Sequence, residues 1–334
     1  MKLVLCYPLE SRHFDQIAAT APQLELVDAG QGRIAEEIFE ADLYCGHAKV
    51  PLPWDEVIRR GRLRWIQSSA AGLDHCLAAA VVDSDVVVTS AAGVLTDQVA
   101  EHAIMFLTAL ARSLPVFFRA QQQRQFVRRP TRDLHEATVG IVGLGSVGRR
   151  LAELLSGFRC RIVAVDTFPV DRPPHVAELW PAERLDDLLA ACQFVVLCLP
   201  LTDQTRGLFD RRRLETMRPG SFLVNVARGP IVVEDDLAAV LATEHLAGAA
   251  LDVTATEPLP ATSLLWDLPN LIITPHVAGQ GARRIDRMTD LLCENLTRYL
   301  AGRPLRNLVD KRLGYPVRRQ QAADEEQATD GEGT

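Results

Sequence analysis

A glycine pattern of the kind that binds phosphate lies near the middle of the chain. The segment Gly143-Leu144-Gly145-Ser146-Val147-Gly148 reads G-x-G-x-x-G, after the apolar run TVGIV and at the start of the helix-like run VGRRLAELL. Gly143 permits a tight turn, Gly145 lets the backbone approach a pyrophosphate, and Gly148 allows the helix to pack closely on the strand. The free N–H groups of a helix N-terminus suit phosphates. This context favours a dinucleotide site over a purely structural glycine-rich turn.

An acidic residue follows at the distance expected for ribose recognition. Asp166 ends the next strand-like run, 18 residues after Gly148, and its carboxylate can accept hydrogen bonds from the adenosine ribose hydroxyls. The alternative role for Asp166 is a turn residue at a strand end. Thr167 and Phe168 come next, so no arginine immediately follows to bind a 2′-phosphate. The pattern predicts NAD as the cofactor, with Arg172 as the basic residue that leaves NADP open.

Three further polar residues follow apolar, strand-like runs in the second half of the chain. Arg228 follows FLVNVA, Glu257 follows ALDVTAT, and His276 follows LIITP. Ligands bind beyond the carboxyl ends of the strands in an open α/β sheet, so these side chains are expected to converge on one crevice. The spacing alone leaves open that they are ordinary loop residues.

The first hundred residues alternate between strand-like and helix-like segments, a rhythm that predicts a small parallel sheet covered by helices. The helix-like segments include Ser11–Ala21 and Trp54–Arg60. The strand-like segments are Lys2–Tyr7, Leu24–Val27, Leu43–Cys45, Leu63–Gln67 and Val86–Thr89.

A second series begins at Thr138, and its six strands with intervening helices match the doubly wound pattern. The predicted strands are Thr138–Val142, Arg161–Val165, Phe194–Leu199, Ser221–Val226, Leu246–Leu251 and Leu271–Thr274. The predicted helices between them are Val147–Ser156, Leu185–Cys192, Arg211–Met217 and Glu234–Thr243.

Two longer helices are predicted around this second series. Asp97–Ser113 has apolar residues at helical spacing and could be capped by Thr96 or Asp97. Gly281–Ala301 is the other helix, while the polar, arginine-rich residues 119–135 are interpreted as a surface connection. The last residues, 318–334, contain no aromatic or branched aliphatic side chain and are expected to be disordered.

Composition excludes several classes of protein. The chain has 334 residues, 48% of them hydrophobic and 24% charged, which are ordinary values for globular domains. Its net charge of −7 argues against a nucleic-acid partner. No apolar run reaches the roughly 18 residues of a membrane span, and the N-terminus lacks the features of a targeting signal, so no membrane partner is expected.

The cysteines indicate free thiols in a reducing cytoplasm. Their number is odd and no two have Cys-x-x-Cys spacing, so neither a disulfide framework nor a metal site is expected. They are Cys6, Cys45, Cys76, Cys160, Cys192, Cys198 and Cys293.

Several segments together resemble the D-isomer-specific 2-hydroxyacid dehydrogenase family, in the family's own order, from about residue 40 to 285. The Arg-Gly, Asp-Val…Glu-Pro and Pro-His motifs make this resemblance specific. The segments are LRWIQSSAAGLDH, GIVGLGSVGRRLAELL, LCLPLTDQTRGLFD, MRPGSFLVNVARGPIVVEDDL, GAALDVTATEPLP and NLIITPHVAG.

The resemblance implies an α/β fold with two doubly wound parallel-sheet domains. A Rossmann-type NAD domain, residues 102–282, would be inserted into a smaller flavodoxin-like substrate domain. The substrate domain would combine residues 1–101 with a returning segment, residues 283–317, before the tail 318–334. The helices Asp97–Ser113 and Gly281–Ala301 would connect the two domains.

The resemblance also assigns catalytic roles. Arg228 matches the arginine that binds the substrate carboxylate and polarises the carbonyl, which suits a planar guanidinium. His276 matches the general acid/base that exchanges a proton with the substrate oxygen. Glu257 matches the partner that fixes the imidazole tautomer and favours the imidazolium form.

The other site residues come from the same resemblance. Asp252 matches the residue that holds the nicotinamide carboxamide, and the backbone of Ser69, Ala70, Ala71 and Gly72 matches the loop that holds the substrate carboxylate. The expected cofactor-binding residues are Gly143, Gly145, Ser146, Val147, Gly148, Asp166, Pro200, Ala227, Asp252 and Thr96. The expected substrate-binding residues are Ser69, Ala70, Ala71, Gly72, Arg228 and His276.

The chain departs from the usual family pattern without touching the catalytic three. Phe158 is followed by Arg159 and Cys160 where Phe-Gly is usual, and the other departures are Gln193, Cys198 and Gly281. Among the remaining histidines, His102 is interpreted as a packing residue, and His47 and His75 flank loops that could border the substrate. The histidines interpreted as surface residues are His13, His135, His175 and His245.

We expect an NAD-dependent oxidoreductase that transfers hydride between nicotinamide and C2 of a small 2-hydroxy or 2-oxo acid. Glyoxylate or hydroxypyruvate is the expected oxo acid, and phosphoglycerate is disfavoured because residues after 318 could not form an added regulatory domain. The alternatives are an NAD(H)-sensing, corepressor-like protein and a relative that uses NAD for internal redox chemistry. The long helix Asp97–Ser113 is apolar on more than one face, so a homodimer is expected unless the two domains of one chain bury it.

Overall fold

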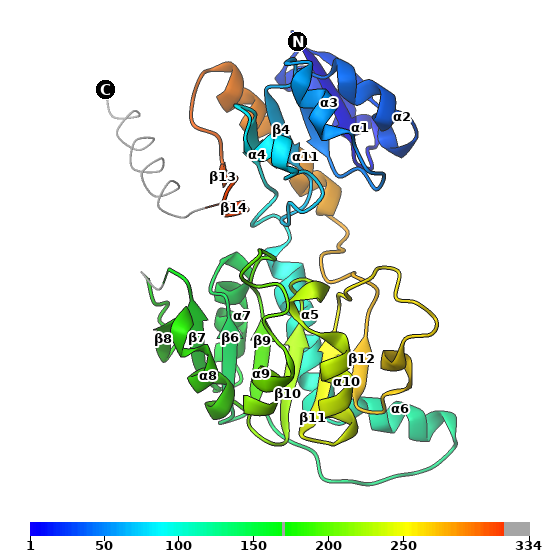
Figure 1. Ribbon diagram of the computed structural model, residues 1–334, viewed down its shortest axis with the longest axis vertical. Helices are drawn as coiled ribbons and strands as arrows, with labels where there is room; N and C mark the ends of the chain where they lie inside the picture. The colour runs from blue at the N-terminus through cyan, green and yellow to red at the C-terminus, as the bar shows by residue number, and fades with distance from the viewer. Residues whose placement is uncertain (169–170, 317–334) are drawn as a thin grey trace. The chain divides into compact units, whose positions relative to one another are not determined.

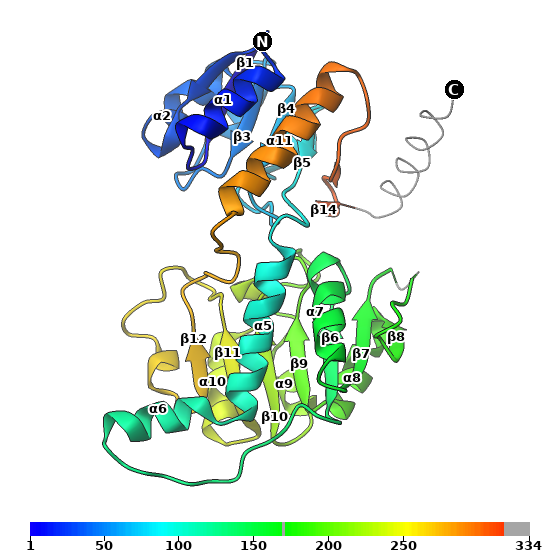
Figure 2. The same cartoon turned by 180° about the vertical axis from the view of Figure 1, so that it is seen from behind.

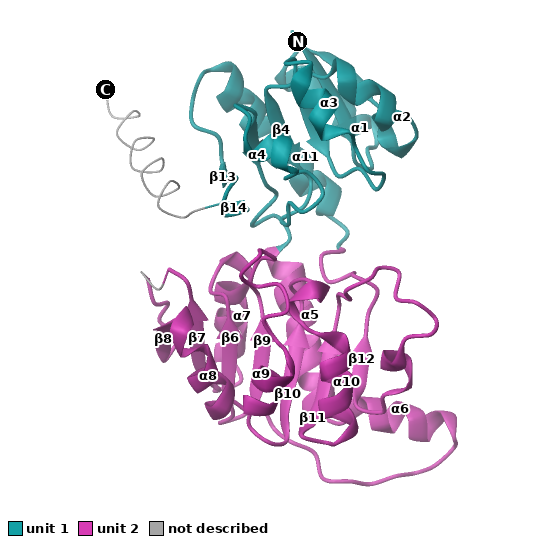
Figure 3. Cartoon of the chain, viewed as in Figure 1, with its two compact units in different colours: residues 1–95, 281–334 teal, residues 96–280 magenta. Residues whose placement is uncertain are grey.

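The structure, a computed structural model, describes residues 1–168 and 171–316, which form two compact units. Unit 1 comprises residues 1–95 and the segment that starts at residue 281, and unit 2 comprises residues 96–280 (Figure 3). The two parts of unit 1 are therefore separated along the chain by the whole of unit 2. The predicted disordered tail, 318–334, lies outside the described residues.

Unit 1 contains a five-stranded parallel sheet with the strand order β2-β1-β3-β4-β5. This is the 2-1-3-4-5 order of flavodoxin-like folds, as predicted. All five predicted strands are present. They are β1 (Lys2–Cys6), β2 (Glu25–Asp28), β3 (Leu43–Gly46), β4 (Trp65–Ser68) and β5 (Val87–Thr89).

Helices cover both faces of this sheet because alternate strand residues point to opposite sides. On one face, Leu3 and Leu5 share a core with Met288 and Leu292 of α11 (Arg284–Leu300), which packs beside α1 (Ser11–Thr20) (Figure 2). The returning segment thus completes the core that the first strands begin. The other face is covered by α2 (Gly30–Glu37), α3 (Trp54–Arg59) and α4 (Ala79–Val82).

Unit 2 contains a seven-stranded parallel sheet with the order β12-β11-β10-β9-β6-β7-β8. Counted within the unit, this is the dinucleotide-binding order 3-2-1-4-5-6 with one more strand, so the predicted doubly wound fold is confirmed. The strands are β6 (Thr138–Val142), β7 (Arg161–Asp166), β8 (Glu178–Pro181), β9 (Phe194–Leu197), β10 (Ser221–Asn225), β11 (Leu246–Leu251) and β12 (Leu271–Ile273).

The six predicted strands are present, but the seventh, β8, was not predicted. It is a short edge strand, half-exposed along most of its length and ending at Pro181, so it lacks the apolar run of its neighbours. Proline is tolerated in a sheet at such an edge position.

Helices also cover both faces of the larger sheet. In Figure 1 the face toward the viewer carries α8 (Leu185–Ala191), α9 (Arg211–Thr216) and α10 (Glu234–Ala242). The opposite face carries α5 (Thr96–Ala111) and α7 (Ser146–Ser156), which Figure 2 shows in front. Small residues such as Ala100 and Ala103 let α5 approach α7 closely.

The segment 119–135 is not wholly a connection, which corrects the prediction. Its first part belongs to α6 (Leu114–Gln122), which has a proline near its N-terminus, where the missing N–H of proline is tolerated.

No single helix among the described residues is long and apolar enough to cross a membrane. Helices α5 and α6 reach that length only together, and they are bent by 68° at their junction.

One surface prediction was wrong. His13 is 1% exposed, and its ring joins α1 to α11 through a 2.8 Å contact between Nε2 and Oδ1 of Asp286. His135 and His175 are exposed, and His245 is half-buried.

All seven cysteines are unpaired thiols, as predicted, and five of them are buried. Burial raises the pKa of Cys6 to about 11 and that of Cys198 to about 12. These two thiols are therefore protonated, and so poorly nucleophilic, at neutral pH.

Candidate active site

The predicted residues of unit 2 lie along one edge of its sheet. Gly143 follows β6, Asp166 ends β7, Pro200 comes after β9, Arg228 after β10, Asp252 after β11, and His276 after β12. All of these strands are parallel, so their carboxyl ends share this edge. The strand order reverses between β6 and β9, the position at which such sheets bind ligands.

The three fingerprint glycines have different steric surroundings. A Cβ at Gly143, where φ is +92°, would stand 2.8 Å from the carbonyl oxygen of Cys198, and one at Gly148 would stand 2.2 Å from the carbonyl oxygen of Gly143. At Gly145, the N-cap of α7, no heavy atom of the chain lies within 4 Å of that position. Gly143 and Gly148 thus allow close packing, whereas the backbone at Gly145 faces open space.

The carboxylate of Asp166 holds the glycine loop. One oxygen accepts the N–H of Leu144 at 2.6 Å, and the other accepts the N–H of Phe168 at 2.8 Å. A carboxylate has about four acceptor positions, so two remain for other donors such as ribose hydroxyls. The structure therefore shows the alternative role of Asp166, that of a residue that braces the turn at a strand end, and its contact with the ribose stays a prediction.

The residues at this edge fit a dinucleotide cofactor. The open backbone at Gly145 and the N-terminus of α7, with Ser146 and Val147, suit a pyrophosphate. The hydroxyl of Thr96, also expected to contact the cofactor, is buried without a hydrogen-bond partner among the described residues. A buried polar group of this kind is normally paired, so a ligand donor or acceptor would satisfy it.

His276 and Glu257 meet at the end of the sheet. Nδ1 of His276 lies 2.7 Å from Oε2 of Glu257, and the other oxygen of Glu257 accepts the N–H of Thr254 at 3.1 Å. The second contact fixes the carboxylate, and the first orients the ring, so Nε2 of His276 is left for another partner. Both side chains are partly exposed, so they are accessible to a substrate.

Asp252 organises the loop that carries His276. Its carboxylate is 2% exposed and accepts the N–H groups of Val277 and Ala278, each at 2.9 Å. The N–H of His276 also donates to the Asp252 carbonyl oxygen at 2.7 Å. His276 has φ of +54°, a left-handed conformation that is costly for this residue type, and these contacts hold it there.

A hydroxyl and a second histidine extend this network. Thr274 donates its hydroxyl hydrogen to Asp252 at 2.6 Å, and Nε2 of His102 lies 3.0 Å from the same hydroxyl oxygen. Burial lowers the pKa of His102, so the ring is neutral at neutral pH. Since Thr274 donates onward, His102 must donate through Nε2–H. His102 is thus a hydrogen-bonded packing residue on α5.

We expect Thr274→Val to lower turnover by about 10- to 150-fold, because it removes the hydrogen bond to the Asp252 carboxylate, worth about 1.5–3 kcal/mol, and so weakens the support of the His276 loop. Cofactor affinity should stay near the parent value. The measurement is steady-state kinetics with NADH titration, and Thr274→Ser, which keeps the hydroxyl, should restore most of the activity. Equal loss in both variants would contradict this role.

The backbone around Arg228 is fixed by residues that sequence reasoning missed. Asn225 is fully buried, donates from Nδ2 to the carbonyl oxygen of Arg228 at 3.0 Å and accepts the N–H of Ala227 at 3.0 Å. A Cβ at Gly229 would stand 1.9 Å from the carbonyl carbon of Thr254. The arginine loop therefore lies directly against the loop that leads to Glu257. The only sequence signal for Asn225 is a polar residue within an apolar strand.

The predicted carboxylate loop belongs to unit 1, and part of its backbone is already hydrogen-bonded. Ser69 donates its N–H to the carbonyl oxygen of Gly46 at 3.2 Å, and Ala70 donates its N–H to the hydroxyl of Ser68 at 3.0 Å. Within the described part of the chain, the N–H groups of Ala71 and Gly72 have no protein acceptor. Only the second half of the loop can therefore offer two donors to a substrate.

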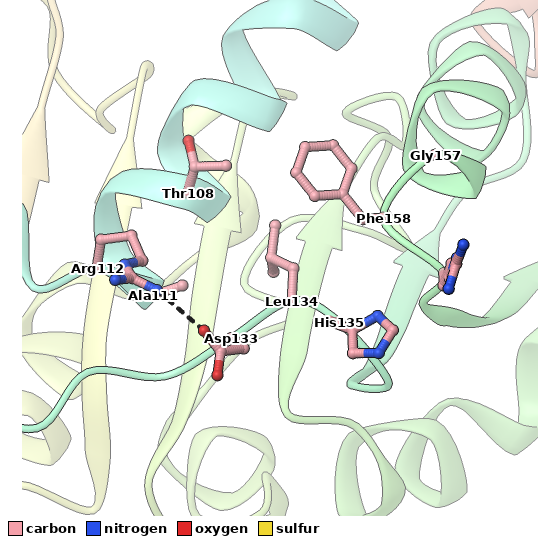
Figure 4. A pocket seen from close by; sticks show the side chains of 9 residues that line it. Thr108, Ala111, Arg112, Asp133, Leu134, His135, Gly157 and Phe158 are labelled. Atoms are coloured by element: carbon pink, nitrogen blue, oxygen red, sulfur yellow. Dashed lines mark hydrogen bonds and ion pairs between the residues drawn. The ribbon is translucent and has the colours of Figure 1, made fainter.

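No group of three or more His, Cys, Asp or Glu side chains in residues 1–168 and 171–316 is placed to hold a metal ion. A surface hollow of about 510 Å³ is lined by the end of α5 and by residues 133–135 and 157–159, with Arg112 paired to Asp133 (Figure 4). Those two segments precede β6 and β7, so the hollow lies at the opposite, amino-terminal edge of the sheet.

Comparison with known proteins places this geometry in context. Residues 104–278 match the family model described as the D-isomer specific 2-hydroxyacid dehydrogenase, NAD binding domain. The chain is 37% identical to the (S)-sulfolactate dehydrogenase of Chromohalobacter salexigens over 245 residues, 72% of this chain and 79% of that protein. It is 32% identical to the glyoxylate reductase of Thermofilum pendens over 262 residues, 75% and 76% of the two chains.

Solved structures agree with this relationship. The D-isomer specific 2-hydroxyacid dehydrogenase of Xanthobacter autotrophicus Py2, solved with NADPH and MES, is 31% identical, with a TM-score of 0.79 over 94% of this chain and 99% of that chain. The chain spans only about half the length, 55%, of the mycobacterial D-3-phosphoglycerate dehydrogenases that it also matches.

Proposed function

Because the chain belongs to the D-isomer specific 2-hydroxyacid dehydrogenase family, we propose that it is an NAD-dependent oxidoreductase acting at C2 of a small 2-hydroxy or 2-oxo acid. The observation that carries this proposal is the 2.7 Å contact between Nδ1 of His276 and Oε2 of Glu257 at the ligand-binding edge of the sheet. Glyoxylate or hydroxypyruvate is the proposed oxo acid, and sulfopyruvate enters as a further candidate through the sulfolactate relative.

His276 handles the proton of the reaction. When bound, the nicotinamide dinucleotide supplies a hydride to C2 or accepts one from it. In the reductive direction His276 donates the Nε2 proton to the carbonyl oxygen, which becomes the hydroxyl, and in oxidation the same nitrogen takes the proton back. Glu257 stabilises the positive charge of the protonated ring and keeps Nε2 directed away from its own carboxylate.

Arg228 orients the substrate. Its guanidinium can bind the substrate carboxylate through two parallel hydrogen bonds, while its positive charge polarises the adjacent carbonyl. We propose that the N–H groups of Ala71 and Gly72 also bind a substrate carboxylate. In unit 2 the cofactor would be held by the loop from Gly143 to Gly148, by Thr96 and Asp166, and by Pro200, Ala227 and Asp252.

A panel of 2-oxo acids tests the proposed function. The protein is mixed with NADH and glyoxylate, hydroxypyruvate, pyruvate, oxaloacetate or 3-sulfopyruvate, and the nicotinamide absorbance is followed. We expect turnover with at least one acid. Tight NADH binding without turnover of any acid would instead support the NAD(H)-sensing alternative.

We expect NADH to be preferred over NADPH by about 5- to 150-fold in catalytic efficiency. A 2′-phosphate near Asp166 would repel its carboxylate by about 4 kcal/mol at 4 Å and an effective dielectric near 20, and solvent reduces this to about 1–3 kcal/mol. Asp166→Ser should erode the preference by removing the repulsion and one ribose contact. The measurement is kcat/KM with each cofactor in the parent and the variant.

The substitution also loosens the glycine loop, so only the ratio of the two efficiencies tests cofactor choice. Asp187→Ser, which removes an exposed carboxylate paired with Arg184, is the control and should leave the ratio unchanged. A parent that prefers NADPH, or a ratio unmoved by Asp166→Ser, would shift the assignment to a basic residue such as Arg172.

We propose that the chain forms a homodimer through α5, α6 and the segment that follows them. Apolar side chains are exposed along this stretch, and Phe126 is 93% exposed. They are Met105, Leu114, Phe118, Phe126 and Val127. We expect sedimentation velocity at micromolar concentration to give twice the mass of one chain, whereas a pure monomer would reject the dimer.

The unpaired cysteines support a cytoplasmic location.

A further inference from the structure

Buried hydrogen bonds connect the returning segment of unit 1 to the predicted carboxylate loop. After α11, the chain runs beside the end of β5, where Leu308 forms an antiparallel bridge with Thr89. Asn307 lies in this segment with φ of +56° and is 8% exposed. It contacts Ser90, 217 positions earlier in the chain. The contact therefore joins the two parts of unit 1 that unit 2 separates in sequence.

The side-chain amide of Asn307 donates to two backbone carbonyl oxygens. Its Nδ2 lies 3.2 Å from the carbonyl oxygen of Ser90 and 2.7 Å from that of Ala92. Both of these partners are acceptors, so the group that faces them must be the NH2 group. The backbone carbonyl oxygen of Asn307 also accepts the N–H of Ser90 at 3.1 Å. Asn307 thus fixes the backbone of residues 90–92.

Two peptide groups extend this contact to the carboxylate loop. The peptide group between Ser90 and Ala91 accepts the first of these hydrogen bonds at its oxygen, and its N–H donates to the carbonyl oxygen of Ala70 at 3.0 Å. That oxygen belongs to the peptide group between Ala70 and Ala71. Both peptide bonds are trans, so oxygen and hydrogen point in opposite directions in each group. A chain of hydrogen bonds that begins at Asn307 therefore sets the direction of the Ala71 N–H.

The loop holds the same carbonyl group by a second contact. The hydroxyl of the buried Ser68 donates to the carbonyl oxygen of Ala70 at 2.9 Å, and the hydroxyl oxygen accepts the N–H of Ala70 at 3.0 Å. The peptide group between Ala70 and Ala71 is thus hydrogen-bonded twice at its oxygen. Ala71 is exposed, and its N–H is one of the two loop donors that have no protein acceptor among the described residues.

A second buried asparagine fixes the residue before Asn307. Asn295 of α11 accepts the N–H of Arg306 at 2.8 Å and donates from Nδ2 to the carbonyl oxygen of Arg306 at 3.1 Å. The same Nδ2 donates to Oε1 of Gln67 at 2.9 Å, and Nε2 of Gln67 donates to the carbonyl oxygen of Ser68 at 3.0 Å. Two routes of hydrogen bonds thus lead from the returning segment to the loop, one through Asn307 and one through Gln67.

We propose that Asn307 is a positioning residue for the substrate carboxylate, and that it acts by orienting and polarising the N–H of Ala71 through the two intervening peptide groups. Hydrogen bonds in such a chain polarise one another, so a donor at one end makes the N–H at the other end a better donor. The inference rests on the proposed function for the identity of the anion, the carboxylate of a 2-oxo acid. Without the Asn307 amide, the Ala71 N–H loses both direction and strength.

Asn307→Asp tests this chain with little change of shape. Aspartate adopts the left-handed backbone conformation more readily than most residues, but it replaces the NH2 group with an oxygen that repels the carbonyl oxygens of Ser90 and Ala92. We expect kcat/KM for the best oxo acid of the panel to fall roughly 10- to 100-fold, the range of one charge-assisted hydrogen bond. The loss should appear chiefly in KM, because the carboxylate is held alike in the ground state and the transition state. The affinity for NADH should stay near the parent value.

Asn270→Asp is the matched control. Asn270 precedes β12 in unit 2, and its Nδ2 donates to the carbonyl oxygen of Leu241 at 3.1 Å. Both substitutions remove an amide donor from a main-chain carbonyl group, so both should lower the thermal unfolding midpoint, but only Asn307→Asp should raise KM. An unchanged KM in Asn307→Asp, or an equal rise in Asn270→Asp, would overturn the assignment.

A second variant keeps the test available if Asn307→Asp does not fold. Asn307→Gly removes the same donor without adding a repelling oxygen, and glycine adopts a positive φ at no steric cost. We expect KM to rise in this variant too, by less than in Asn307→Asp. A folded Asn307→Gly with the parent KM would overturn the assignment.

A binding measurement separates this inference from the proposed function. Oxamate, an unreactive analogue of a 2-oxo acid, is titrated into the full-length protein in the presence of NADH, while the backbone amide resonances of Ala71 and Gly72 are followed by NMR. We expect an Ala71 shift that saturates in the parent and in Asn270→Asp, with a dissociation constant roughly 10- to 100-fold higher in Asn307→Asp. This result supports the role of Asn307 even if no oxo acid is turned over.

Two results of the titration would overturn the role of Asn307. One is an Ala71 resonance that oxamate leaves unmoved in the parent, and the other is an equal dissociation constant in the parent and in Asn307→Asp. Turnover of an oxo acid by the parent in either case would leave the proposed oxidoreductase function intact.

Discussion

Replacing His276 by asparagine is expected to lower turnover by about 10²–10⁴-fold, the usual contribution of a general acid–base group. The variant has no ring nitrogen to give or take a proton at the substrate oxygen. Asparagine is the appropriate substitution because position 276 has φ of +54°, a left-handed conformation that asparagine adopts more readily than most residues. Steady-state kinetics with the best oxo acid of the panel measures the effect.

Binding of NADH and the thermal unfolding midpoint serve as the controls for His276→Asn. Both should stay near the parent values, because the backbone N–H at position 276 still donates to the carbonyl oxygen of Asp252. Near-full activity at neutral pH would show that another group supplies the proton. Loss of NADH affinity in parallel with turnover would indicate a collapsed loop instead of lost proton transfer.

Replacing Arg228 by lysine is the second substitution with a large expected effect. Lysine keeps the positive charge but lacks the planar fork that forms two parallel hydrogen bonds with a carboxylate. Arg228 is half-buried, and its Nη1–H donates a hydrogen bond to the carbonyl oxygen of Ala227 at 2.8 Å. Loss of one charge-assisted hydrogen bond costs about 1.5–3 kcal/mol, so kcat/KM for the oxo acid should fall roughly 10- to 150-fold.

Both KM and kcat should change in Arg228→Lys, since the arginine binds the carboxylate and polarises the carbonyl. NADH affinity should stay the same. Arg206→Lys, at an exposed arginine of the same unit, is the matched control and should behave like the parent. An unchanged Michaelis constant together with an unchanged rate would remove Arg228 from the substrate site.

The sheets were predictable because their strands are short apolar runs separated by helices with a clear period. The strand orders also follow from general rules for doubly wound sheets once the number of βα units is known. β8 escaped prediction because an edge strand is covered less and needs fewer apolar residues. His13 was misplaced because its polarity suggests the surface, whereas Asp286, distant in sequence, pairs with it in the interior.

The candidate site was harder to predict in its supporting contacts than in its reacting groups. A carboxylate such as Asp252 can bind a ligand or brace a loop, and sequence position does not distinguish the two roles. Its contacts with Val277 and Ala278 become visible only when the ends of β11 and β12 are placed side by side. The same applies to Asn225, whose importance comes from which backbone groups it faces.

The interrupted course of unit 1 along the chain has a consequence for biosynthesis. A ribosome releases residues 1–95 first, yet the core around Leu3 and Leu5 lacks Met288 and Leu292 until α11 is made. Unit 2 is continuous and can fold as soon as it has emerged. Until α11 follows, residues 1–95 keep one apolar face of their sheet uncovered. The first-made part of the protein is therefore the last to mature, and during elongation that face is a target for a chaperone that binds exposed apolar strands.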